Sequence, residues 1–303
     1  MNIKQKIKSF LKNRLKLRHP ITYLADYKKR KKLDQDKKKY QEKYTAKDIL
    51  DSLVKNGLKK GDTLFIHSSW DHFFNYEGTP KELIDILLEY LTKEGTLAMP
   101  CFPAIQDNTK IFNVKRTPSG AGFLTEMFRR YKGTIRSISL NHSVCAIGKN
   151  AEFLTKDHHK SETSWDEMSP YYRLKEVDAQ IVGLGVGHNL EIATALHCVE
   201  AILRKEIHFY TLLFPTKVEY EYKDINGNIG KHSFLKRVGD IDTRKISKYF
   251  DKTELIEYQI SNLEIYAIRA NILIPRAIEL GRKGVTMYVK PKPKMELFRK
   301  LKK

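Results

Sequence analysis

The chain has 303 residues, which is enough to bury one large core or two small ones. Its hydrophobic content of 41%, with 11% aromatic residues, is typical of a globular protein and excludes a disordered chain. The net charge of +20 would suggest nucleic-acid binding, but residues 1–43 contribute +12 and residues 290–303 contribute +6, which leaves +2 for the remainder. Because the central part is nearly neutral, we expect no nucleic-acid partner.

Cysteine content and hydropathy restrict where the protein is expected to work. Its three cysteines, Cys101, Cys145 and Cys198, form no Cys-x-x-Cys motif, so neither a disulfide framework nor a metal site is predicted. No apolar run approaches the roughly 20 residues that span a bilayer. The lysine-rich N-terminus also lacks the apolar stretch of a signal peptide. We therefore expect a cytoplasmic protein without a metal.

Helix-like and strand-like segments alternate from residue 45 onward. Thr45 with Asp48 predicts the capped start of a helix that ends at Gly57, and Thr79-Pro80 predicts the start of a second helix. Strands are expected at 63–66 and 96–99. The apolar faces of the two helices are predicted to consist of Ile49, Leu50, Leu53 and Val54 in the first and Leu83, Ile84, Ile86, Leu87 and Leu91 in the second.

The same alternation continues along the chain. A helix is predicted at 122–130, strands at 143–147 and 179–184, and then a helix that is capped by Asn189 and extends to about Arg204. Alternating strands and helices are typical of a sheet covered by helices on both faces. We therefore predict an α/β fold with a three-layer α/β/α core.

The part after residue 215 has a different pattern. Apolar and polar residues alternate over 218–222, Asn226-Gly227 occupies a hairpin turn, and 232–238 would be the returning strand. With helices expected near 243–251 and 262–280, this part predicts an added antiparallel α+β portion. The expected organisation is a basic N-terminal extension at 1–43, one large domain at 44–289 and a basic C-terminal tail at 290–303.

Three short motifs carry polar groups that could bind a ligand. His67-Ser68-Ser69 follows a predicted strand, where ligands commonly bind in α/β folds, although such serines also cap helices and turns. The small residues around Ser119 and Gly120 precede a predicted helix and would let an anion approach the backbone; an ordinary loop is the alternative. His142-Ser143 opens another strand, where a hydrogen-bonded core histidine is the alternative interpretation.

A Gly-rich turn at 183–189 is the fourth and richest motif. Thr194, His197 and Glu200 follow it at three-residue spacing, so they are expected to lie near one face of a helix. A histidine beside a carboxylate can act as a general base. A solvated polar helix face is the alternative. The turn is not a dinucleotide-binding fingerprint, because its glycines have the wrong spacing and no acidic residue follows about 20 residues later.

The order of these motifs resembles one family, the aminoglycoside 3-N-acetyltransferases. The resemblance covers about residues 45–205 and rests on His67-Ser68-Ser69, Met99-Pro100-Cys101-Phe102, Thr117-Pro118-Ser119, His142-Ser143-Val144, Ser169-Pro170, Leu184-Gly185-Val186-Gly187-His188, and Leu196-His197 with Glu200. It implies the fold of this family and an acyltransferase that uses acetyl-CoA as cosubstrate without a metal.

The resemblance also implies roles for particular residues. His197 would accept the proton of the attacking amine of an amino sugar, and Glu200 or Asp240 would orient its imidazole. Direct transfer in a ternary complex is implied. The expected coenzyme A site consists of His67, Ser68, Ser69, Ser119, Gly120, His142 and Ser143. The expected acceptor site consists of Asp166, Glu167 and His188.

This chain departs from the family pattern at several positions. Asn141 replaces a threonine, residues 166–168 replace a glycine-containing stretch, and the segment 188–197 is about two residues longer. Where the family has an acidic partner for the helix histidine, only Asp240 offers a carboxylate. The acceptor is therefore left open between an aminoglycoside, as in antibiotic resistance, and an amino sugar of cell-surface polysaccharide biosynthesis.

Two other classes of protein are also consistent with the sequence. One is a polycationic binding protein without catalysis, and the other is a nucleotide-dependent enzyme that uses the turn at 183–189. A homo-oligomer is left open as an assembly.

The N-terminal extension has a pattern that the family resemblance does not account for. Its apolar residues Ile3, Ile7, Phe10, Leu11 and Leu15 fall on one stripe of a helix, and lysines and arginines fill most of the remainder. This pattern is typical of a helix in the interface of an anionic membrane. A helix packed on the protein's own core or on a partner subunit is the alternative. The extension therefore predicts peripheral contact with the inner face of the membrane.

Overall fold

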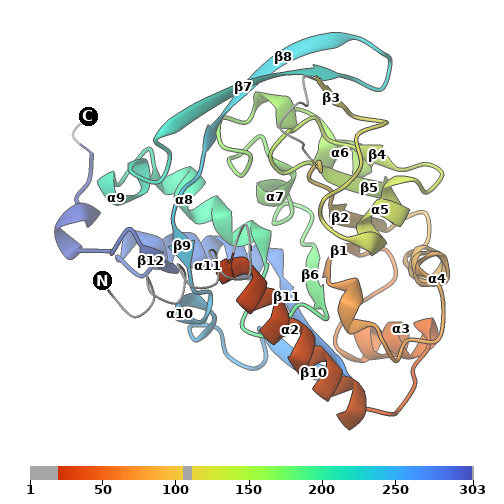
Figure 1. Ribbon diagram of the computed structural model, residues 1–303. Helices are drawn as coiled ribbons and strands as arrows, with labels where there is room; N and C mark the ends of the chain where they lie inside the picture. Colours follow the sequence, from red (N-terminus) through yellow and green to blue (C-terminus); the bar gives the residue numbers. More distant parts are fainter. Residues whose placement is uncertain (1–19, 105–110, 302–303) are drawn as a thin grey trace. The chain divides into compact units, whose positions relative to one another are not determined.

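A computed structural model describes residues 20–104 and 111–301 (Figure 1). The chain forms two compact units, Met1–Lys43 and Tyr44–Lys303. The described part of the first unit contains helix α2 (Pro20–Lys39), which has no acidic residue in its first turn and has Lys37, Lys38 and Lys39 in its last turn. The predicted apolar stripe from Ile3 to Leu15 lies outside the described residues.

A seven-stranded mixed sheet forms the centre of the second unit. Its strand order is β10-β11-β6-β1-β2-β5-β4, in which β6, β1 and β2 are parallel and the other pairs are antiparallel (Figure 1). The strands are β1 (Thr63–Ser68), β2 (Thr96–Pro100), β4 (Ile135–Arg136), β5 (Val144–Gly148), β6 (Gln180–Leu184), β10 (Ile256–Ile260) and β11 (Leu263–Arg269).

Helices cover both faces of this sheet. Successive residues of a strand point to opposite sides, so a strand of apolar residues contributes to a core on each face. In β1, Leu64 and Ile66 belong to one hydrophobic core and Phe65 belongs to the other. The first core includes residues of α3 (Ala46–Lys55), α4 (Pro80–Leu91) and α5 (Phe123–Arg129). The second includes residues of α6 (Ala151–Thr155), α7 (Pro170–Arg173), α8 (Cys198–Leu203), α9 (His208–Thr211) and α11 (Ala270–Arg282). The predicted α/β fold with helices on both faces of the sheet is confirmed.

The predicted starts of α3 and α4 are confirmed. The side chain of Thr45 accepts a hydrogen bond from the backbone of Asp48, and Asp48 bonds back to the backbone of Thr45. Thr79 and Glu82 form the same reciprocal capping box at α4. Each box satisfies backbone N–H groups that a helix start leaves unpaired. Val54 is exposed, so the predicted apolar face of α3 is narrower than expected.

The helix predicted to begin at Asn189 is wrong in its start. Asn189, Leu190 and Ile192 have φ values of 57°, 59° and 61°, which a right-handed helix does not allow. The chain instead turns through these residues and enters a 3-10 helix, η3 (Thr194–His197), that continues into α8.

The helix predicted over 262–280 is also wrong in its first part. Residues 263–269 form β11, which pairs with β6 and with β10, and only the remainder forms α11. Ile265 and Ala267 enter one core while Tyr266 and Ile268 enter the other. Because both faces are buried, nearly every position is apolar and the sequence lacks the alternation that identifies a strand. The helix expected near 243–251 is the short α10 (Arg244–Ser247).

The antiparallel portion consists of two smaller sheets. A hairpin of β7 (Thr216–Lys223) and β8 (Ile229–Lys236) pairs with β3 (Ile111–Asn113) and runs along one side of the unit in Figure 1. Strand β9 (Asp240–Ile241) pairs with β12 (Tyr288–Lys290). The predicted hairpin is confirmed, with its turn at Asn226-Gly227.

The described residues after β12 pack against α9 and the residues around Glu206 within the second unit. The 3-10 helix η4 (Met295–Phe298) stacks Phe298 on Phe209 of α9, with ring centroids 4.7 Å apart. The backbone N–H of Leu301 donates to the carbonyl oxygen of Glu206 at 2.9 Å. The remaining short elements are η1 (Trp70–His72) and η2 (His158–Lys160). Among the described residues, no helix combines the length and apolar character that crossing a membrane requires.

Candidate functional site

The first, second and fourth sequence motifs meet at the end of β1. The backbone N–H of Ser69 donates to the carbonyl oxygen of Leu184 at 3.0 Å, so the end of β1 lies beside the Gly-rich turn. The start of α5 lies close to the same strand, because a Cβ added at Gly122 would be 3.8 Å from the carbonyl oxygen of Ser68. Carboxyl ends of parallel strands are the usual ligand-binding edge of such a sheet.

The third motif joins this group through the end of β2. The backbone N–H of Cys101 donates to the carbonyl oxygen of Ser143 at 2.7 Å. The N–H of Gly120 donates to the carbonyl oxygen of Phe102 at 2.8 Å. Segments around residues 68, 120, 143 and 184 are therefore connected by backbone hydrogen bonds or close packing.

At two positions of the fourth motif, steric constraints explain why the residue is glycine. A Cβ at Gly183 would lie 2.2 Å from the ring of Tyr266 on the neighbouring strand. Gly185 has a φ of 68°, and a Cβ there would lie 3.2 Å from the carbonyl oxygen of Ser69. These positions need glycine for strand packing and for the turn, so the Gly-rich pattern by itself does not require a nucleotide.

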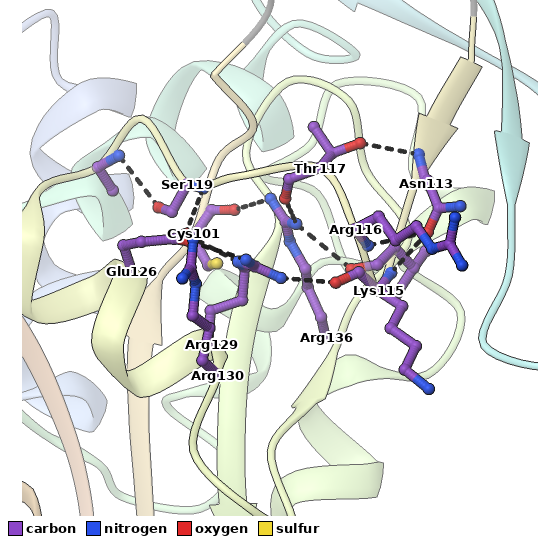
Figure 2. A network of polar contacts seen from close by, with 12 residues as sticks. Cys101, Asn113, Lys115, Arg116, Thr117, Ser119, Glu126, Arg129, Arg130 and Arg136 are labelled. Atoms are coloured by element: carbon purple, nitrogen blue, oxygen red, sulfur yellow. Dashed lines mark hydrogen bonds and ion pairs between the residues drawn. The ribbon is translucent and has the colours of Figure 1, made fainter.

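Arg136 holds the loop that contains Ser119. Its guanidinium donates to the carbonyl oxygens of Cys101 and Thr117, each at 2.6 Å, and to that of Val114 at 3.3 Å (Figure 2). Its Nε also donates to the hydroxyl of Ser143 at 3.1 Å, and that hydroxyl donates to the carbonyl oxygen of Cys101. The hydroxyl of Ser143 is therefore engaged in holding the backbone.

Glu126 fixes the other side of the same loop. Its carboxylate accepts hydrogen bonds from the backbone N–H of Ser119 and from the side chain of Arg129, each at 2.8 Å (Figure 2). A further bond comes from Arg130. The bonds from Arg129 make the largest contribution in lowering the pKa of Glu126 to about 2. The loop around Ser119 and Gly120 is thus held in place by charge-assisted hydrogen bonds to the side chains of Glu126 and Arg136.

His67 lies in the interior and is 2% exposed. Burial lowers the pKa of His67 to about 3, so its ring is neutral at physiological pH. Its Nε2 is buried and has no hydrogen-bond partner. The ring packs edge-on against Phe65 with centroids 5.2 Å apart. Ser68 and Ser69, which follow it, are partly exposed.

Three rings are in contact around Trp165. The indole of Trp165 packs against the imidazoles of both His142 and His197, with centroid distances of 4.6 and 5.0 Å and tilted ring planes. Burial, followed by the proximity of His197, lowers the pKa of His142. Packing on Trp165 limits the orientations that the His197 ring can adopt.

His197 forms a short hydrogen bond to a buried carboxylate. Its Nδ1 lies 2.6 Å from Oε1 of Glu200, which is 0% exposed, and the side chain of His197 is 12% exposed. The same Oε1 accepts a hydrogen bond from the hydroxyl of Tyr288 at 2.7 Å. With Nδ1 bonded to a carboxylate, the neutral ring carries its proton there and presents a lone pair at Nε2. This arrangement can accept a proton.

Several buried polar atoms around these residues lack partners. They belong to His67 (Nε2), His142 (Nδ1), Trp165 (Nε1), Tyr171 (Oη), His188 (Nδ1) and Glu200 (Oε2). Buried polar groups are hydrogen-bonded in most proteins, so each unpaired one needs an explanation such as a bound ligand, an ion or a water. Among the described residues, five further unpaired buried atoms belong to Tyr44, Gln180, Arg204, Tyr258 and Asn262, so such atoms are not confined to the four sequence motifs.

The predicted acceptor residues do not form one cluster. Asp166 is 4% exposed, and its carboxylate accepts backbone N–H bonds from Glu162 at 2.7 Å and Thr163 at 3.2 Å, so it holds its own turn. Glu167 is exposed and faces Lys205 at 4.0 Å. The contacts of these two carboxylates therefore lead to their own turn and to Lys205 rather than to His197.

His188, the third predicted acceptor residue, follows the end of β6, and Asp240, the alternative partner predicted for His197, lies on β9. His188 lines a cavity of about 840 Å³ together with Glu191 and Glu264. Asp240 is largely exposed and pairs with Lys290 at 3.2 Å. Of the two carboxylates proposed as partners of His197, the geometry therefore supports Glu200 and not Asp240.

Sequence reasoning missed Trp165, Arg136 and Tyr288. Trp165 is one of only two tryptophans in the chain, and that rarity was the one available signal. Tyr288 lies 88 residues after Glu200, so no local pattern connects them. The described residues contain no group of three or more histidine, cysteine, aspartate or glutamate side chains able to hold a metal ion.

A second buried histidine, His158, supports the loop before Trp165. Its Nδ1 lies 2.8 Å from the hydroxyl of Ser137, and its Nε2 lies 3.2 Å from the carbonyl oxygen of Ser164. The hydroxyl of Ser137 also accepts the N–H of Val144 at 2.8 Å. This chain of bonds requires a neutral ring that accepts at Nδ1 and donates at Nε2. Burial makes the largest contribution in lowering the pKa of His158 to about 3.

We predict that the protein loses stability as pH falls below 6.5. Histidine in the unfolded chain binds a proton below about 6.5, whereas His67 and His158 bind one only near 3, so the unfolded state binds more protons in between. The free energy of unfolding should therefore fall by about 1.4 kcal/mol per pH unit for each residue. Urea unfolding between pH 7 and pH 4.5 measures this slope.

A single variant checks the cause. His158→Gln removes one of the two rings and should reduce the slope by about 1.4 kcal/mol per pH unit. Equal slopes in the parent and in His158→Gln would contradict the assignment to His158.

Comparisons with solved structures identify the fold. The chain superposes on a mutant of aminoglycoside acetyltransferase AAC(3)-IVa in complex with gentamicin, with a TM-score of 0.69 and 22% identity, covering 83% of this chain and 94% of that one. AAC(3)-Xa gives a TM-score of 0.68 at 19% identity, covering 85% and 99%. AAC-IIIb, solved as a binary complex with CoASH, gives 0.66 at 18% identity, covering 83% and 100%. The class of protein is therefore one with the aminoglycoside acetyltransferase fold.

Sequence comparisons identify the family. A family model described as aminoglycoside 3-N-acetyltransferase matches residues 65–280. The chain belongs to the aminoglycoside 3-N-acetyltransferase family.

Two curated relatives show the extent of the similarity. The SPbeta prophage-derived aminoglycoside N(3')-acetyltransferase-like protein YokD of Bacillus subtilis (strain 168) is 28% identical over 178 residues, which cover 52% of this chain and 64% of the relative. Aminoglycoside N(3)-acetyltransferase IV of Salmonella sp is 28% identical over 166 residues, which cover 54% and 61%. The matched region thus spans less than two thirds of the length of these relatives.

Proposed function

We propose that the protein transfers an acetyl group from acetyl-CoA to an amine of an amino sugar. The observation that carries the proposal is the 2.6 Å contact between Nδ1 of His197 and the fully buried carboxylate of Glu200. A general base needs a free lone pair and a partner that stabilises its protonated form, and this pair supplies both. Family membership and the fold shared with a CoASH-bound acetyltransferase support the choice of acyl donor.

The chemistry is direct transfer within a ternary complex. The acceptor amine attacks the thioester carbonyl carbon, and Nε2 of His197 takes the proton that the nitrogen loses. The new C–N bond forms as the C–S bond breaks, and the departing thiolate receives that proton from the imidazolium of His197, which returns the ring to its neutral form. Glu200 stabilises the imidazolium in between, because opposite charges interact strongly in a buried site. No covalent enzyme intermediate and no metal are required.

The donor would bind beside the ends of β1 and β2. Ser68, Ser69 and the unpaired buried nitrogens of His67 and His142 offer hydrogen-bonding groups for the pantetheine arm and thioester. The backbone N–H groups of Ser119 and Gly120 already donate to Glu126 and Phe102, so this loop would contribute the wall of the site rather than an anion-binding backbone. Hydrogen bonds to Glu126 and Arg136 fix the position of the loop around Ser119. Ser143 would act indirectly, since its hydroxyl already donates to the carbonyl oxygen of Cys101 at 2.6 Å.

The acceptor would be a cationic amino sugar. The cavity of about 840 Å³ beside the Gly-rich turn is lined by His188, by the acidic residues Glu191, Glu264 and Asp242, and by Arg244, which pairs with Asp242 at 2.8 Å. Negative charge at this place favours a polyamine ligand. Gentamicin and apramycin are bound in solved structures of AAC(3)-IVa, which makes an aminoglycoside the first acceptor to test. An amino sugar of cell-surface polysaccharide assembly is the alternative.

An assay of thiol release from acetyl-CoA tests the function. We expect free thiol to appear only when an amine acceptor is present, with aminoglycosides and nucleotide- or lipid-linked amino sugars compared in one panel. Mass spectrometry should find one added acetyl group on the acceptor. An absence of transfer to every member, in protein whose melting temperature rises with acetyl-CoA, would exclude amino sugars as acceptors. An absence of both would exclude the acetyltransferase function.

Membrane contact by the N-terminal unit stays a prediction. The described part of this unit ends α2 with three successive lysines, which suits an anionic surface. Cosedimentation with phosphatidylglycerol vesicles, comparing the full chain with a form that lacks residues 1–43, measures it. Equal recovery of both forms in the pellet would contradict it.

A further inference from the structure

Two side chains from distant parts of the chain hold the carboxylate that partners His197. The hydroxyl of Tyr288 lies 2.7 Å from Oε1 of Glu200, and a terminal guanidinium nitrogen of Arg237 lies 3.1 Å from that hydroxyl. Nε of Arg237 is 4.0 Å from the same carboxylate oxygen. Because arginine only donates and a carboxylate only accepts, Tyr288 accepts from Arg237 and donates to Glu200.

The surroundings make room for Tyr288 and keep it protonated. Gly239 has a φ of 111°, and a Cβ there would lie 2.9 Å from the Tyr288 ring, so glycine leaves space for the phenol. Lys245 donates to the backbone carbonyl of Tyr288 at 2.5 Å. Burial, and then the charge of Glu200, raises the pKa of Tyr288 well above its usual value. The hydroxyl therefore remains a donor.

The burial of Glu200 explains why such partners are needed. The residue is 0% exposed, and its second oxygen, Oε2, has no hydrogen-bond partner. An ionised carboxylate in this position is costly unless it is hydrogen-bonded and near a positive charge. Among the described residues, Arg237 is the cation that contacts it.

We propose that Tyr288 and Arg237 are positioning residues that hold the carboxylate of Glu200 against Nδ1 of His197. Nε2 of His197 is thereby left free to accept the proton of the amine. This inference rests on the proposed function. Tyr288 lies beyond residues 65–280, the region that matches the family model, so the family match does not include it.

The other titratable groups around the pair have different roles. His142 and His197 both pack against Trp165, and burial lowers the pKa of His142, so it stays neutral. The hydroxyl of Tyr210 lies near Glu200 but donates to the carbonyl oxygen of Gly281 at 3.3 Å. The thiol of Cys198 is buried, and burial followed by the charge of Glu200 raises its pKa, so it also stays neutral.

Removing either positioning residue should slow catalysis and shift its pH dependence. Tyr288→Phe is expected to lower kcat about ten- to a hundredfold, with the KM for acetyl-CoA little changed. Arg237→Gln removes the positive charge that lies 4.0 Å from Glu200, so the acid limb of the kcat/KM profile, which reports the His197–Glu200 pair, should move to higher pH. Arg237→Lys keeps the positive charge and should return the acid limb most of the way to the pH at which the parent protein shows it.

Matched controls separate positioning from a general loss of packing. Tyr210→Phe removes a buried tyrosine hydroxyl that bonds to backbone and should leave the pH profile unchanged. Arg237 is partly exposed, with 20% of its side chain accessible, so its variants are expected to fold even if Tyr288→Phe does not.

A measurement without turnover distinguishes failure of this inference from failure of the proposed function. In protein labelled with nitrogen-15 at histidine, the ring signals of His197 report its tautomer and titration directly. We expect Tyr288→Phe and Arg237→Gln to move its titration midpoint and Tyr210→Phe to leave it in place. If neither of the first two moves it, the positioning role is overturned whatever the activity. A shift without any acetyl transfer would retain the positioning role and reject the proposed reaction.

Discussion

Replacing His197 with alanine is expected to lower the turnover number by a factor of about 10² to 10⁴. The imidazole is the group that accepts the amine proton, and its contact with Glu200 at 2.6 Å is lost with it. The affinity for acetyl-CoA should change little, because the proposed donor groups lie on other segments. Steady-state kinetics gives the turnover number, and calorimetric titration with coenzyme A gives the affinity.

Two further histidine variants make this result specific. His142→Ala should weaken coenzyme A binding more than it lowers turnover, since His142 belongs to the proposed donor site and contacts Trp165, whereas the proton acceptor is His197. His159→Ala should change neither, because that ring lies against Tyr222 of the β7–β8 hairpin. Near-normal turnover in His197→Ala would mean that another group accepts the proton.

Replacing Arg136 with methionine is expected to lower the free energy of unfolding by about 3 kcal/mol or more. Arg136 is 9% exposed and donates to three backbone carbonyl groups and to the hydroxyl of Ser143. Methionine is also a long unbranched side chain but would leave these acceptors without a donor. Urea unfolding measures the change, which should lower the midpoint without altering the slope.

Arg130→Met is the matched control for this variant. Arg130 also pairs with Glu126, at 2.6 Å, but 64% of its side chain is exposed. Exposed ion pairs contribute roughly 0 to 1 kcal/mol. If the two substitutions destabilised the protein equally, the buried network would not be the cause.

The first half of the fold was predictable because its signals are local. The capping boxes at Thr45 and Thr79 depend on residues only three positions apart, and the structure has both. Strands β1 and β2 are short apolar runs bounded by turns, and both lie where the sequence placed them. Local hydrogen bonding is encoded within a few residues, so a single sequence reveals it.

The second half contained errors where distant contacts decide the structure. Strand β11 is buried on both faces by its place between β6 and β10, and its sequence alone does not distinguish it from a helix. The turn at Asn189 adopts left-handed backbone where a helix cap was expected, and its side-chain oxygen accepts a hydrogen bond from Ser247 at 3.3 Å. Fifty-eight residues separate those two positions.

The candidate site shows the same division. The His197–Glu200 pair was predictable from three-residue spacing on one helix. The choice between Glu200 and Asp240 was not, because it depends on how β9 pairs with β12 and carries Asp240 toward Lys290. Trp165 and Tyr288 reach His197 and Glu200 from loops and strands that no local pattern connects to α8.

The distance along the chain between Glu200 and Tyr288 also affects the order in which the protein can be made. Ribosomes add roughly 5 to 20 residues per second, so the 88 residues between them take several seconds to synthesise. During that time α8 can form while its carboxylate still lacks the phenol. A nascent chain that has reached only α11 would therefore leave Glu200 without this hydrogen bond, and its surrounding core would close when β12 arrives to pair with β9. Fusing a bulky partner just after β12 should then impair maturation more than the same fusion before α2.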